Sequence, residues 1–535
     1  MKKLPIGIQS IKKILSNDEY VYIDKTEFVK KLIDEGAPHY FLSRPRRFGK
    51  SLFLNTLAEV FRGNKDLFKG CQIYESDYDW KEHPVIYLDL SKVFNTTPEA
   101  LEIGLQESLE DIANFYEEPI SGSTSISRLN RLITALSKRD QVVVLVDEYD
   151  KPIIDQLHNL DVAKKNRETL KGLFGSLKGL DEHLKFTFTT GVSKFTQVSL
   201  FSGLNHLKDI TIDPLYAGIL GYTEDEIKMC FSDHVKDVVK TYNNSGKSVK
   251  DQDVLEEIRY WYNGYRFSES NECVYNPFST LNFLEDKKVK AYWYRTGTPS
   301  FLIEQLKKYS TSMIPLDGTT ATEKELMDIN SLEKIDLKSL MYQTGYFTIK
   351  EYNSISKRYK LGLPNEEVRT AFVDSLVKNF SNIVEVKSSE KFVNALQNHE
   401  IELLFQHLAQ GFASFAYQVF SDAKESTYHG MLLSMLYGMG FDPISERATN
   451  IGRIDVVLEL SKITYIIELK LDSKPEVALE QIRKKEYFKP YTQKGKEIAI
   501  VGASFSSEKR NISDWNGEIL SEDGRFITKL ASDKT

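Results

Sequence analysis

Residues 44–51 read Arg-Pro-Arg-Arg-Phe-Gly-Lys-Ser and stand between an apolar run at 39–43 and an amphipathic segment that begins at Leu52. A strand that passes through a Gly-Lys-Ser turn into a helix can cradle a phosphate, because backbone N–H groups and the helix N-terminus face the anion. The lysine adds a positive charge, and the serine offers its hydroxyl to Mg²⁺. We therefore expect the phosphates of a nucleotide to be bound by Arg46, Arg47, Phe48, Gly49, Lys50 and Ser51.

A second segment, residues 142–148, is a β-branched run that ends in two carboxylates, Asp147 and Glu148. Such a run suits a strand that is buried on both faces of a parallel sheet. At the carboxyl edge of that sheet Asp147 can complete a Mg²⁺ shell with Ser51, and Glu148 can orient or deprotonate an attacking water. Together the two segments predict an ATP-binding and ATP-hydrolysing domain in the N-terminal half.

One position departs from the usual phosphate-loop pattern. Glycine is expected five residues before Gly49, and Arg44 occupies that position, which implies a different path for the start of the loop. The alternative interpretation is a chance Gly-Lys-Ser on a basic surface turn. The strand that ends in two carboxylates favours the phosphate cradle, because a motif is supported by its context.

Charged residues also interrupt two apolar, strand-like runs near the C-terminus. Asp455 lies in the first run, and Glu468 and Lys470 lie in the second, 463–470. Twelve residues separate Asp455 from Glu468, which suits two antiparallel strands whose carboxylates meet at one end. Together with the carbonyl of Leu469, these carboxylates are hard oxygen ligands for Mg²⁺ or Mn²⁺. Lys470 shares a strand face with Glu468, where it can orient a nucleophile or steady a phosphate.

The same residues admit a structural interpretation. Glu-x-Lys on a strand is usually a solvated face with a marginal ion pair. This strand is otherwise apolar, so Glu468 would be costly to place unless a metal or a partner satisfied it. We therefore favour a metal site, to which Glu425 can bring a further carboxylate. A later helix that carries Gln481 has a basic face able to follow a phosphate backbone.

The composition of the 535-residue chain is that of a soluble globular protein, with 41% hydrophobic and 27% charged residues. Its length suggests roughly three or four domains. The net charge of −7 gives no global cationic field, so contact with nucleic acid would need a local basic patch. Three dispersed cysteines fit a reducing cytoplasm, and without a long apolar run no membrane span is expected.

The order of strand-like and helix-like patterns positions both candidate sites. Strands separated by helical stretches up to residue 213 predict a parallel sheet with helices on both faces. Residues 214–318 read as a helical region and 319–409 as a small helical, winged-helix-like module, before the alternation resumes over 410–535. The polar strand end at Thr190 and Ser193 can either sense a terminal phosphate or simply end a strand, and both interpretations stay open.

These segments resemble a bacterial family in which an AAA-ATPase-like domain precedes a PD-(D/E)XK-type nuclease domain. The resemblance extends over nearly the full chain and rests on the motifs at residues 22–26, 41–51, 146–152, 191–195, 452–455 and 467–470. It implies an α/β fold with an additional-strand P-loop sheet over 1–213, a helical lid over 214–318 and a restriction-endonuclease-like α/β domain over 410–535.

The resemblance also implies which residues act. It assigns an ATP site to Lys50, Ser51, Asp147 and Glu148, with a nucleotide contact from Asp24 and Lys25, and a nuclease site to Asp455, Glu468 and Lys470. The cofactors would be ATP and Mg²⁺ or Mn²⁺.

Our leading hypothesis is an enzyme of the bacterial cytoplasm that cleaves DNA or RNA under the control of ATP, with DNA favoured over RNA as the partner and the choice between them left open. A role against phage or other mobile DNA suits such a pairing by analogy, and a homo-oligomer is left open. The alternative is a nucleotide-driven switch or scaffold whose nuclease fold binds nucleic acid or protein without cutting. A small-molecule kinase is disfavoured, because the C-terminal module would then have no task.

Overall fold

The computed structural model describes residues 1–194, 207–246, 248–293, 319–327, 329, 332, 335–372, 389–414, 425–439, 441, 443–449 and 452–530. Phe195, the last residue of the 191–195 motif, and the final part of the expected helical region, 294–318, lie outside these ranges. The chain divides into two units, one of residues 1–301 with 320–367 and the other of 302–319 with 368–535.

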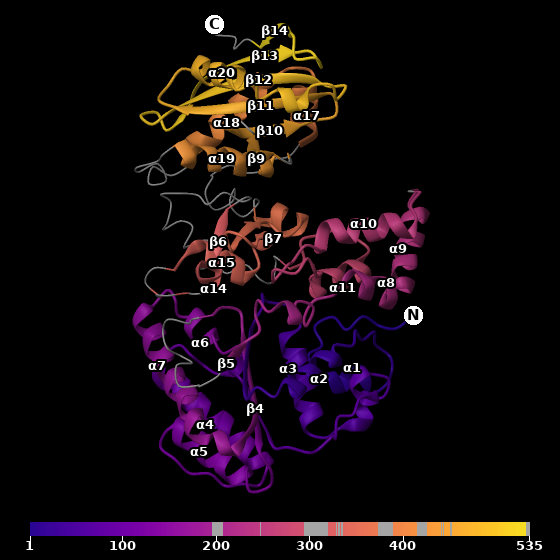
Figure 1. Cartoon of the computed structure of the whole chain (residues 1–535), viewed down its shortest axis with the longest axis vertical. Coiled ribbons are helices and arrows are strands. Elements are labelled where there is room, and N and C mark those ends of the chain that lie inside the picture. Colours follow the sequence, from indigo (N-terminus) through magenta and orange to yellow (C-terminus); the bar gives the residue numbers. More distant parts are fainter. Residues whose placement is uncertain are drawn as a thin grey trace. The chain divides into compact units, whose positions relative to one another are not determined.

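A parallel sheet of five strands forms the centre of the first unit (Figure 1). The strands are β1 (His39–Ser43), β2 (Val85–Asp89), β3 (Val142–Asp147), β4 (Leu184–Gly191) and β5 (Leu207–Asp209). Their order is β2-β3-β4-β1-β5, and every neighbouring pair is parallel. Every residue of β1 and β3 is buried, which explains their apolar composition. Because β4 stands between β1 and β3, the additional-strand sheet is confirmed.

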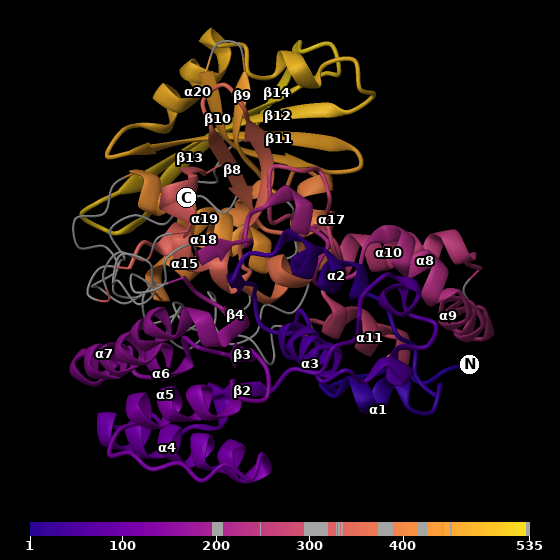
Figure 2. The same cartoon turned by 60° about the horizontal axis from the view of Figure 1, so that its bottom comes forward.

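Helices cover both faces of this sheet. α1 (Ile11–Leu15), α2 (Thr26–Glu35) and α3 (Lys50–Phe61) lie on one side, and α4 (Pro98–Phe115), α5 (Ser125–Leu136), α6 (Lys151–Ile154) and α7 (Leu160–Ser176) lie on the other (Figures 1 and 2). Local sequence sets where these helices begin. Thr97 and Thr124 cap α4 and α5, because each side chain accepts a backbone N–H of the first turn.

A helical region follows the sheet in the chain. It comprises α8 (Glu224–Cys230), α9 (Ser232–Asn244), α10 (Asp251–Tyr262) and α11 (Pro277–Asp286). These helices share an apolar core that includes Ile227, Val238, Ile258 and Phe283. α8 begins with a capping box, in which the side chain of Thr223 accepts the N–H of Glu226 and the carboxylate of Glu226 accepts the N–H of Thr223.

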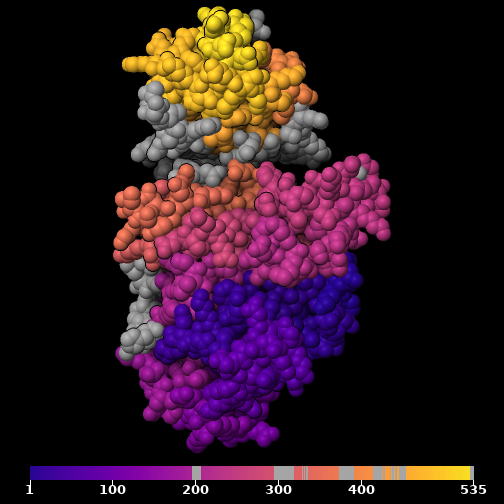
Figure 3. All heavy atoms as spheres, turned by 45° about the vertical axis from the view of Figure 1, so that its right-hand side comes forward, coloured from indigo at the N-terminus to yellow at the C-terminus, as the bar shows by residue number. Residues whose placement is uncertain are grey.

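A small winged-helix-like module completes the first unit. It contains β6 (Thr320–Thr322), α14 (Glu323–Met327), α15 (Leu337–Thr344), β7 (Thr348–Asn353) and β8 (Arg358–Gly362). The strands pair in the order β6-β8-β7, so that two helices precede a hairpin. In the space-filling view the salmon surface of this module continues into the pink surface of α8–α11 (Figure 3).

The second unit is built on a mixed sheet in the order β14-β13-β12-β11-β10-β9. Its strands are β9 (Ile444–Thr449), β10 (Gly452–Glu459), β11 (Ile463–Leu471), β12 (Glu497–Ser506), β13 (Asn511–Leu520) and β14 (Phe526–Leu530). β11 and β12 are parallel, and all the other neighbouring pairs are antiparallel. This arrangement agrees with the restriction-endonuclease-like α/β domain expected from the resemblance.

Helices pack on both faces of the second sheet. α17 (Ser389–Gln397), α18 (Ile401–Ser414) and α19 (Glu425–Gly438) share a core with one face, and α20 (Pro475–Lys484) packs on the other. The sequence pattern predicts that α17 and most of α18 belong to the module at 319–409. The structure packs them on the C-terminal sheet instead, where Trp515 Nε1 donates to Glu402 at 2.9 Å and Tyr465 Oη donates to the carbonyl of Leu396 at 2.7 Å.

Among the helices that the structure describes, none combines the length and the apolarity needed to cross a membrane.

Candidate nucleotide-binding and metal sites

The phosphate loop joins β1 to α3 in the strand–turn–helix order that the sequence predicts. β1 ends at Ser43 and α3 begins at Lys50, so the first N–H groups of α3 are free to bind an anion. Gly49 precedes the helix at φ 94°, a left-handed conformation that glycine adopts without strain. Arg47 is also left-handed, at φ 69°, and its guanidinium lies over the ring of Phe278, 4.9 Å from the centroid.

The ammonium group of Lys50 is buried inside the loop. It donates to the carbonyl oxygens of Arg44 at 2.9 Å and Pro45 at 3.0 Å. Burial lowers the pKa of Lys50, and the charges of Glu148 and Asp147 oppose this shift. The loop therefore keeps a cation in a place where water screens its charge poorly, which favours the binding of phosphate oxygens.

The two carboxylates at the end of β3, Asp147 and Glu148, lie near Lys50 of the phosphate loop. The Oδ1 of Asp147 accepts the N–H of Glu148 at 2.9 Å, and Tyr87 donates to Oδ2 at 3.4 Å. Burial raises the pKa of Asp147, against a hydrogen bond from Ser51 and the charge of Lys50. A hydroxyl and a carboxylate that already contact each other fit the oxygen ligands of Mg²⁺.

A pocket of about 330 Å³ opens at the loop. Its lining includes six of the residues predicted from sequence, Arg46, Arg47, Gly49, Lys50, Ser51 and Glu148. The N-terminal segment adds Gln9, and the helical region adds Tyr222 and Phe278. Phe48 is placed differently, because its side chain is buried against the rings of Tyr265 and Phe267 instead of lining this pocket.

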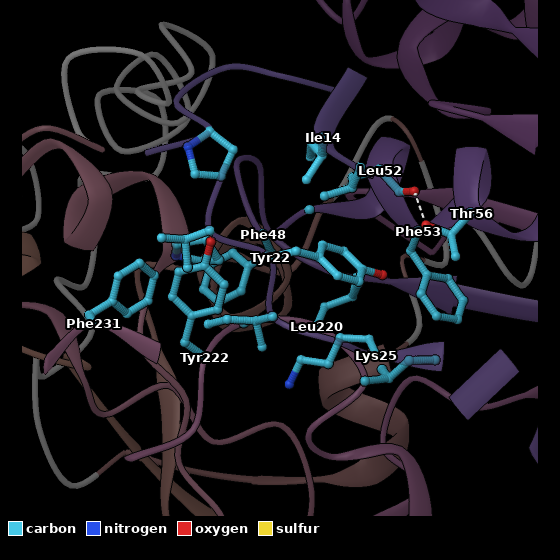
Figure 4. Close-up of a pocket in the computed structure, with 17 residues that line it drawn as sticks. Ile14, Tyr22, Lys25, Phe48, Leu52, Phe53, Thr56, Leu220, Tyr222 and Phe231 are labelled. Carbon is cyan, nitrogen blue, oxygen red and sulfur yellow. Dashed lines mark hydrogen bonds between the residues drawn. The ribbon is translucent and has the colours of Figure 1, made fainter. Parts of the chain in front are cut away.

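A second, apolar pocket of about 70 Å³ adjoins the first (Figure 4). The two pockets share Gly49, Leu52 and Tyr222 in their linings. The aromatic rings of Tyr22, Phe48, Phe53, Tyr222 and Phe231 give the second pocket flat apolar walls. No sequence motif predicts this pocket, since its walls come from segments that are distant along the chain.

Asp24 and Lys25, which the resemblance assigned to the nucleotide, already have protein partners. Lys25 Nζ donates to the carbonyl of Gly218 at 2.8 Å and to the carboxylate of Glu226 at 2.6 Å. Asp24 accepts the N–H of Thr26 at 2.9 Å and that of Gln72 at 2.6 Å. Lys25 lines the apolar pocket, so any contact of this segment with a ligand would be made there.

The end of β4 is held by protein hydrogen bonds. Thr190 Oγ1 donates to the carbonyl of Leu42 at 2.7 Å, which supports its role as a strand end over that of a phosphate sensor. The buried carboxylate of Asp150 accepts the N–H groups of Val192 at 3.0 Å and Ser193 at 2.6 Å. Burial raises the pKa of Asp150 to about 6.

In the second unit, Asp455 and Glu468 lie side by side on β10 and β11. The strands are antiparallel with Val456 opposite Ile467, which makes Asp455 and Glu468 neighbours across the pair. Asp455 Oδ2 accepts the N–H of Leu469 at 2.8 Å. Burial raises the pKa of both carboxyl groups, and that of Glu468 reaches about 7 because Asp455 adds its negative charge. The two carboxylates therefore converge as the spacing predicts.

Lys470 and two helices complete this cluster. Lys470 Nζ lies 3.6 Å from Glu468 Oε1 and 4.0 Å from Glu425 Oε1 at the start of α19. Gln481 of α20 donates to the same oxygen of Glu468. His429 of α19 bonds through Nε2 to the carbonyl of Asp455 at 2.9 Å, a contact that the sequence analysis did not foresee.

The residues of this cluster fit a divalent cation. Glu468 is 2% exposed, and among the residues that the structure describes its Oε2 has no hydrogen-bond partner, which leaves a buried acceptor available for a cation. The Leu469 carbonyl accepts from Lys470 Nζ at 2.9 Å and keeps a second lone pair. Within the described residues, no three His, Cys, Asp or Glu side chains gather as a ready metal site. Asp455, Glu468 and this carbonyl would therefore need water as the remaining ligands.

Gly502→Ala tests how closely α20 must approach the sheet. Gly502 on β12 lies beside Glu468, and a Cβ there would collide with the carbonyl of Pro475 and press on Ala478. Because backbone must move, we expect a loss of about 1–3 kcal/mol of unfolding free energy. The measurement is denaturant unfolding followed by the fluorescence of Trp515. Gly175→Ala, at a helical position with open space, is the control and should be neutral or slightly stabilising.

Comparisons with known proteins match the two units. Residues 5–201 match a family model described as "Predicted AAA-ATPase", and residues 423–515 match one described as "PD-(D/E)XK nuclease superfamily". The chain is 35% identical over 524 residues to an uncharacterized protein in the vnfD 5′ region of Azotobacter chroococcum mcd 1. The aligned region covers 96% of this chain and 98% of that protein. The structure of the Aeropyrum pernix ORC2 protein (ADPNP-ADP complexes) aligns with 65% of this chain and 93% of its own at 10% identity and a TM-score of 0.27, which is too low to support an inference.

Proposed function

This chain belongs to the family that joins an AAA-ATPase-like domain to a PD-(D/E)XK nuclease domain, and we propose that its binding and hydrolysis of ATP control a metal-dependent nuclease. In the N-terminal domain, Lys50 and the N–H groups of α3 bind the phosphates, and Ser51 and Asp147 hold Mg²⁺. Glu148 orients or deprotonates the attacking water. The apolar pocket beside Gly49 accepts the base, because its aromatic walls suit a flat ring.

The nuclease proposal depends on one observation, the convergence of Asp455 and Glu468 beside Lys470, with a buried oxygen on Glu468 that no described residue bonds. A divalent cation bound there activates water and neutralises charge at a phosphodiester. Lys470 directs its ammonium to the same side, where it orients the nucleophile or stabilises the phosphate. Gln481 fixes the carboxylate of Glu468 by its hydrogen bond.

For the substrate we propose DNA before RNA, and for the setting the bacterial cytoplasm, with defence against mobile DNA as the biological role. α20 and the turn that follows it carry Arg483, Lys484, Lys485 and Lys489. Such a basic segment supports contact with a phosphate backbone. Arg483 also pairs with Glu518 and Lys489 with Glu486, so part of this charge is already balanced.

The decisive experiment incubates the purified protein with labelled DNA or RNA, Mg²⁺ or Mn²⁺, and ATP. Cleavage that needs the metal and changes with ATP supports the proposal. ATP turnover with stoichiometric nucleic-acid binding but no products would instead identify a switch or scaffold that does not cut. Light scattering on the same samples, with and without ATP, shows whether the protein forms a homo-oligomer.

Metal binding is expected to strengthen as the pH rises from about 6 to 8. Glu468 must be ionised to bind a cation, whereas burial raises its pKa to about 7. A proton therefore competes with the metal below pH 7, where apparent affinity should fall about tenfold per pH unit, and the affinity should level off above it. Calorimetric titration with Mn²⁺ at constant ionic strength measures this profile. A flat profile would show that Glu468 is not a ligand.

A further inference from the structure

Arg44 stands where a phosphate loop usually carries glycine, and it is 1% exposed. Its Nη1 donates to the carbonyl oxygens of Ser43 at 3.0 Å and Thr211 at 2.5 Å, and its Nη2 donates to that of Tyr216 at 3.5 Å. The left-handed φ angles of the loop fall further along the chain, so a side chain at position 44 brings no backbone strain. The guanidinium thus joins the start of the loop by hydrogen bonds to the segment after β5 that contains Thr211 and Tyr216.

The same guanidinium contacts the loop between α10 and α11, which is hydrogen-bonded to β7 of the winged-helix-like module. It lies over the ring of Phe267, 4.2 Å from the centroid, and Phe48 of the loop meets the same ring edge-on at 5.4 Å. The neighbouring Arg266 donates its N–H to Thr348 of β7 at 2.7 Å. Two residues of the phosphate loop, Arg44 and Phe48, therefore pack against the ring of Phe267. The residue before Phe267 is hydrogen-bonded to the module.

Burying the guanidinium of Arg44 costs free energy of folding that packing alone does not require. The hydrogen bonds of Arg44 go to backbone carbonyls, and its Nε has no hydrogen-bond partner within the described part of the chain. Burial lowers the pKa of Arg44 to about 10. A buried apolar side chain would fill the same space without the cost of desolvating a cation. The backbone of Arg44 also makes two hydrogen bonds. Its carbonyl accepts from Lys50 Nζ, and its N–H donates to the carbonyl of Gly191, at the end of β4, at 3.2 Å.

We infer that Arg44 is a positioning residue of the nucleotide site, which sets the place of Lys50 and links the phosphate loop through Phe267 to the winged-helix-like module. This inference rests on the nucleotide binding proposed above. When the phosphate loop closes on a bound nucleotide, this link shifts the segment at 265–268. That shift changes the position of the module at 320–367.

Arg44→Lys keeps the charge but loses the planar fork and the stacking on Phe267. We expect the KM for ATP to rise about tenfold, as the loss of one or two hydrogen bonds implies, with kcat changed less than about threefold. Hydrogen exchange provides a second readout: ATP should protect residues 265–268 and 345–349 of the wild type, and this protection should be lost in the variant. Phe267→Leu should shift both readouts in the same direction, and the double variant should add little.

Arg128→Lys is the control, because Arg128 of α5 is a half-buried arginine whose side chain also donates to backbone carbonyls, those of Gly122 and Gln106, and does not line the nucleotide pocket. It should leave the KM for ATP and the exchange of residues 265–268 unchanged. If the wild type binds no ATP, the proposed function fails. If the wild type binds ATP while Arg44→Lys and Phe267→Leu keep its KM and its exchange pattern, the inference fails. Should Arg44→Lys not fold, Phe267→Leu tests the same link from the other side.

Discussion

Lys50→Ala is expected to abolish ATP turnover and to weaken ATP binding by at least about 100-fold. The ammonium of Lys50 is buried among the carbonyl oxygens of the loop, so its charge acts on a phosphate with little screening. Removing one partner of such a buried charge pair costs about 2–5 kcal/mol. Calorimetry with ATP and Mg²⁺ measures the affinity, and phosphate release measures the turnover.

Two comparisons make this result interpretable. Lys171→Ala removes a largely exposed lysine of α7 that pairs with Glu168, and it should leave both quantities unchanged. Thermal denaturation of Lys50→Ala shows how much stability is lost when the carbonyls of Arg44 and Pro45 lose their donor, about 1–3 kcal/mol. A folded Lys50→Ala protein that binds and hydrolyses ATP like the wild type would remove the phosphate-loop assignment.

The phosphate loop could be predicted because everything that defines it is local. β1, the Gly-Lys-Ser turn and the start of α3 are contiguous, and the carboxylates of β3 follow a run whose apolar pattern already indicates a buried strand. The place of Arg44 could not be predicted in the same way. Its partners Thr211, Tyr216 and Phe267 are more than 160 residues away along the chain, and only the folded sheet brings them to the loop.

The carboxylate cluster of Asp455 and Glu468 was predictable only in part, as the phosphate loop was. The separation of Asp455 and Glu468 along the chain was enough to predict their meeting, because an antiparallel pair of strands converts sequence spacing into register. The contact of His429 was not predictable, since it depends on how α19 packs against β11. The close approach of α20 depends on Gly502, whose significance appears only when Pro475 is seen to lie against it.

The walls of the apolar pocket are the clearest limit of sequence reasoning. Tyr22, Phe53, Tyr222 and Phe231 are ordinary aromatic residues in their own segments, and aromatic residues most often serve a core. They line one pocket only because α8 and the N-terminal segment meet beside Gly49. The phosphate loop is thus predicted by a motif, whereas the proposed base pocket depends on tertiary packing.

Glu468→Gln is expected to abolish metal-dependent cleavage and, without metal, to stabilise the fold. The amide keeps the volume of the side chain but removes the negative charge that binds the cation. The folded-state pKa of Glu468, about 7, is raised, so the folded protein binds more protons than the unfolded chain and loses stability as the pH rises towards 7. Above pH 7 the ionised carboxylate should cost about 3 kcal/mol, which the amide avoids.

Denaturant unfolding at pH 8 with EDTA, beside cleavage assays with Mn²⁺, tests both signs on one variant. A merely structural glutamate would give lower stability when replaced, whereas a residue retained for metal binding gives lost cleavage and gained stability.

Lys470→Ala should reduce kcat by about 100–1000-fold while Mn²⁺ affinity stays within a few-fold, because its charge acts on the reacting phosphate and not as a ligand. Gln481→Ala should instead weaken Mn²⁺ binding by about 10–100-fold, since it only fixes the orientation of Glu468. Cleavage that survives both Glu468→Gln and Lys470→Ala would place the nuclease chemistry elsewhere or reduce the domain to a binding fold.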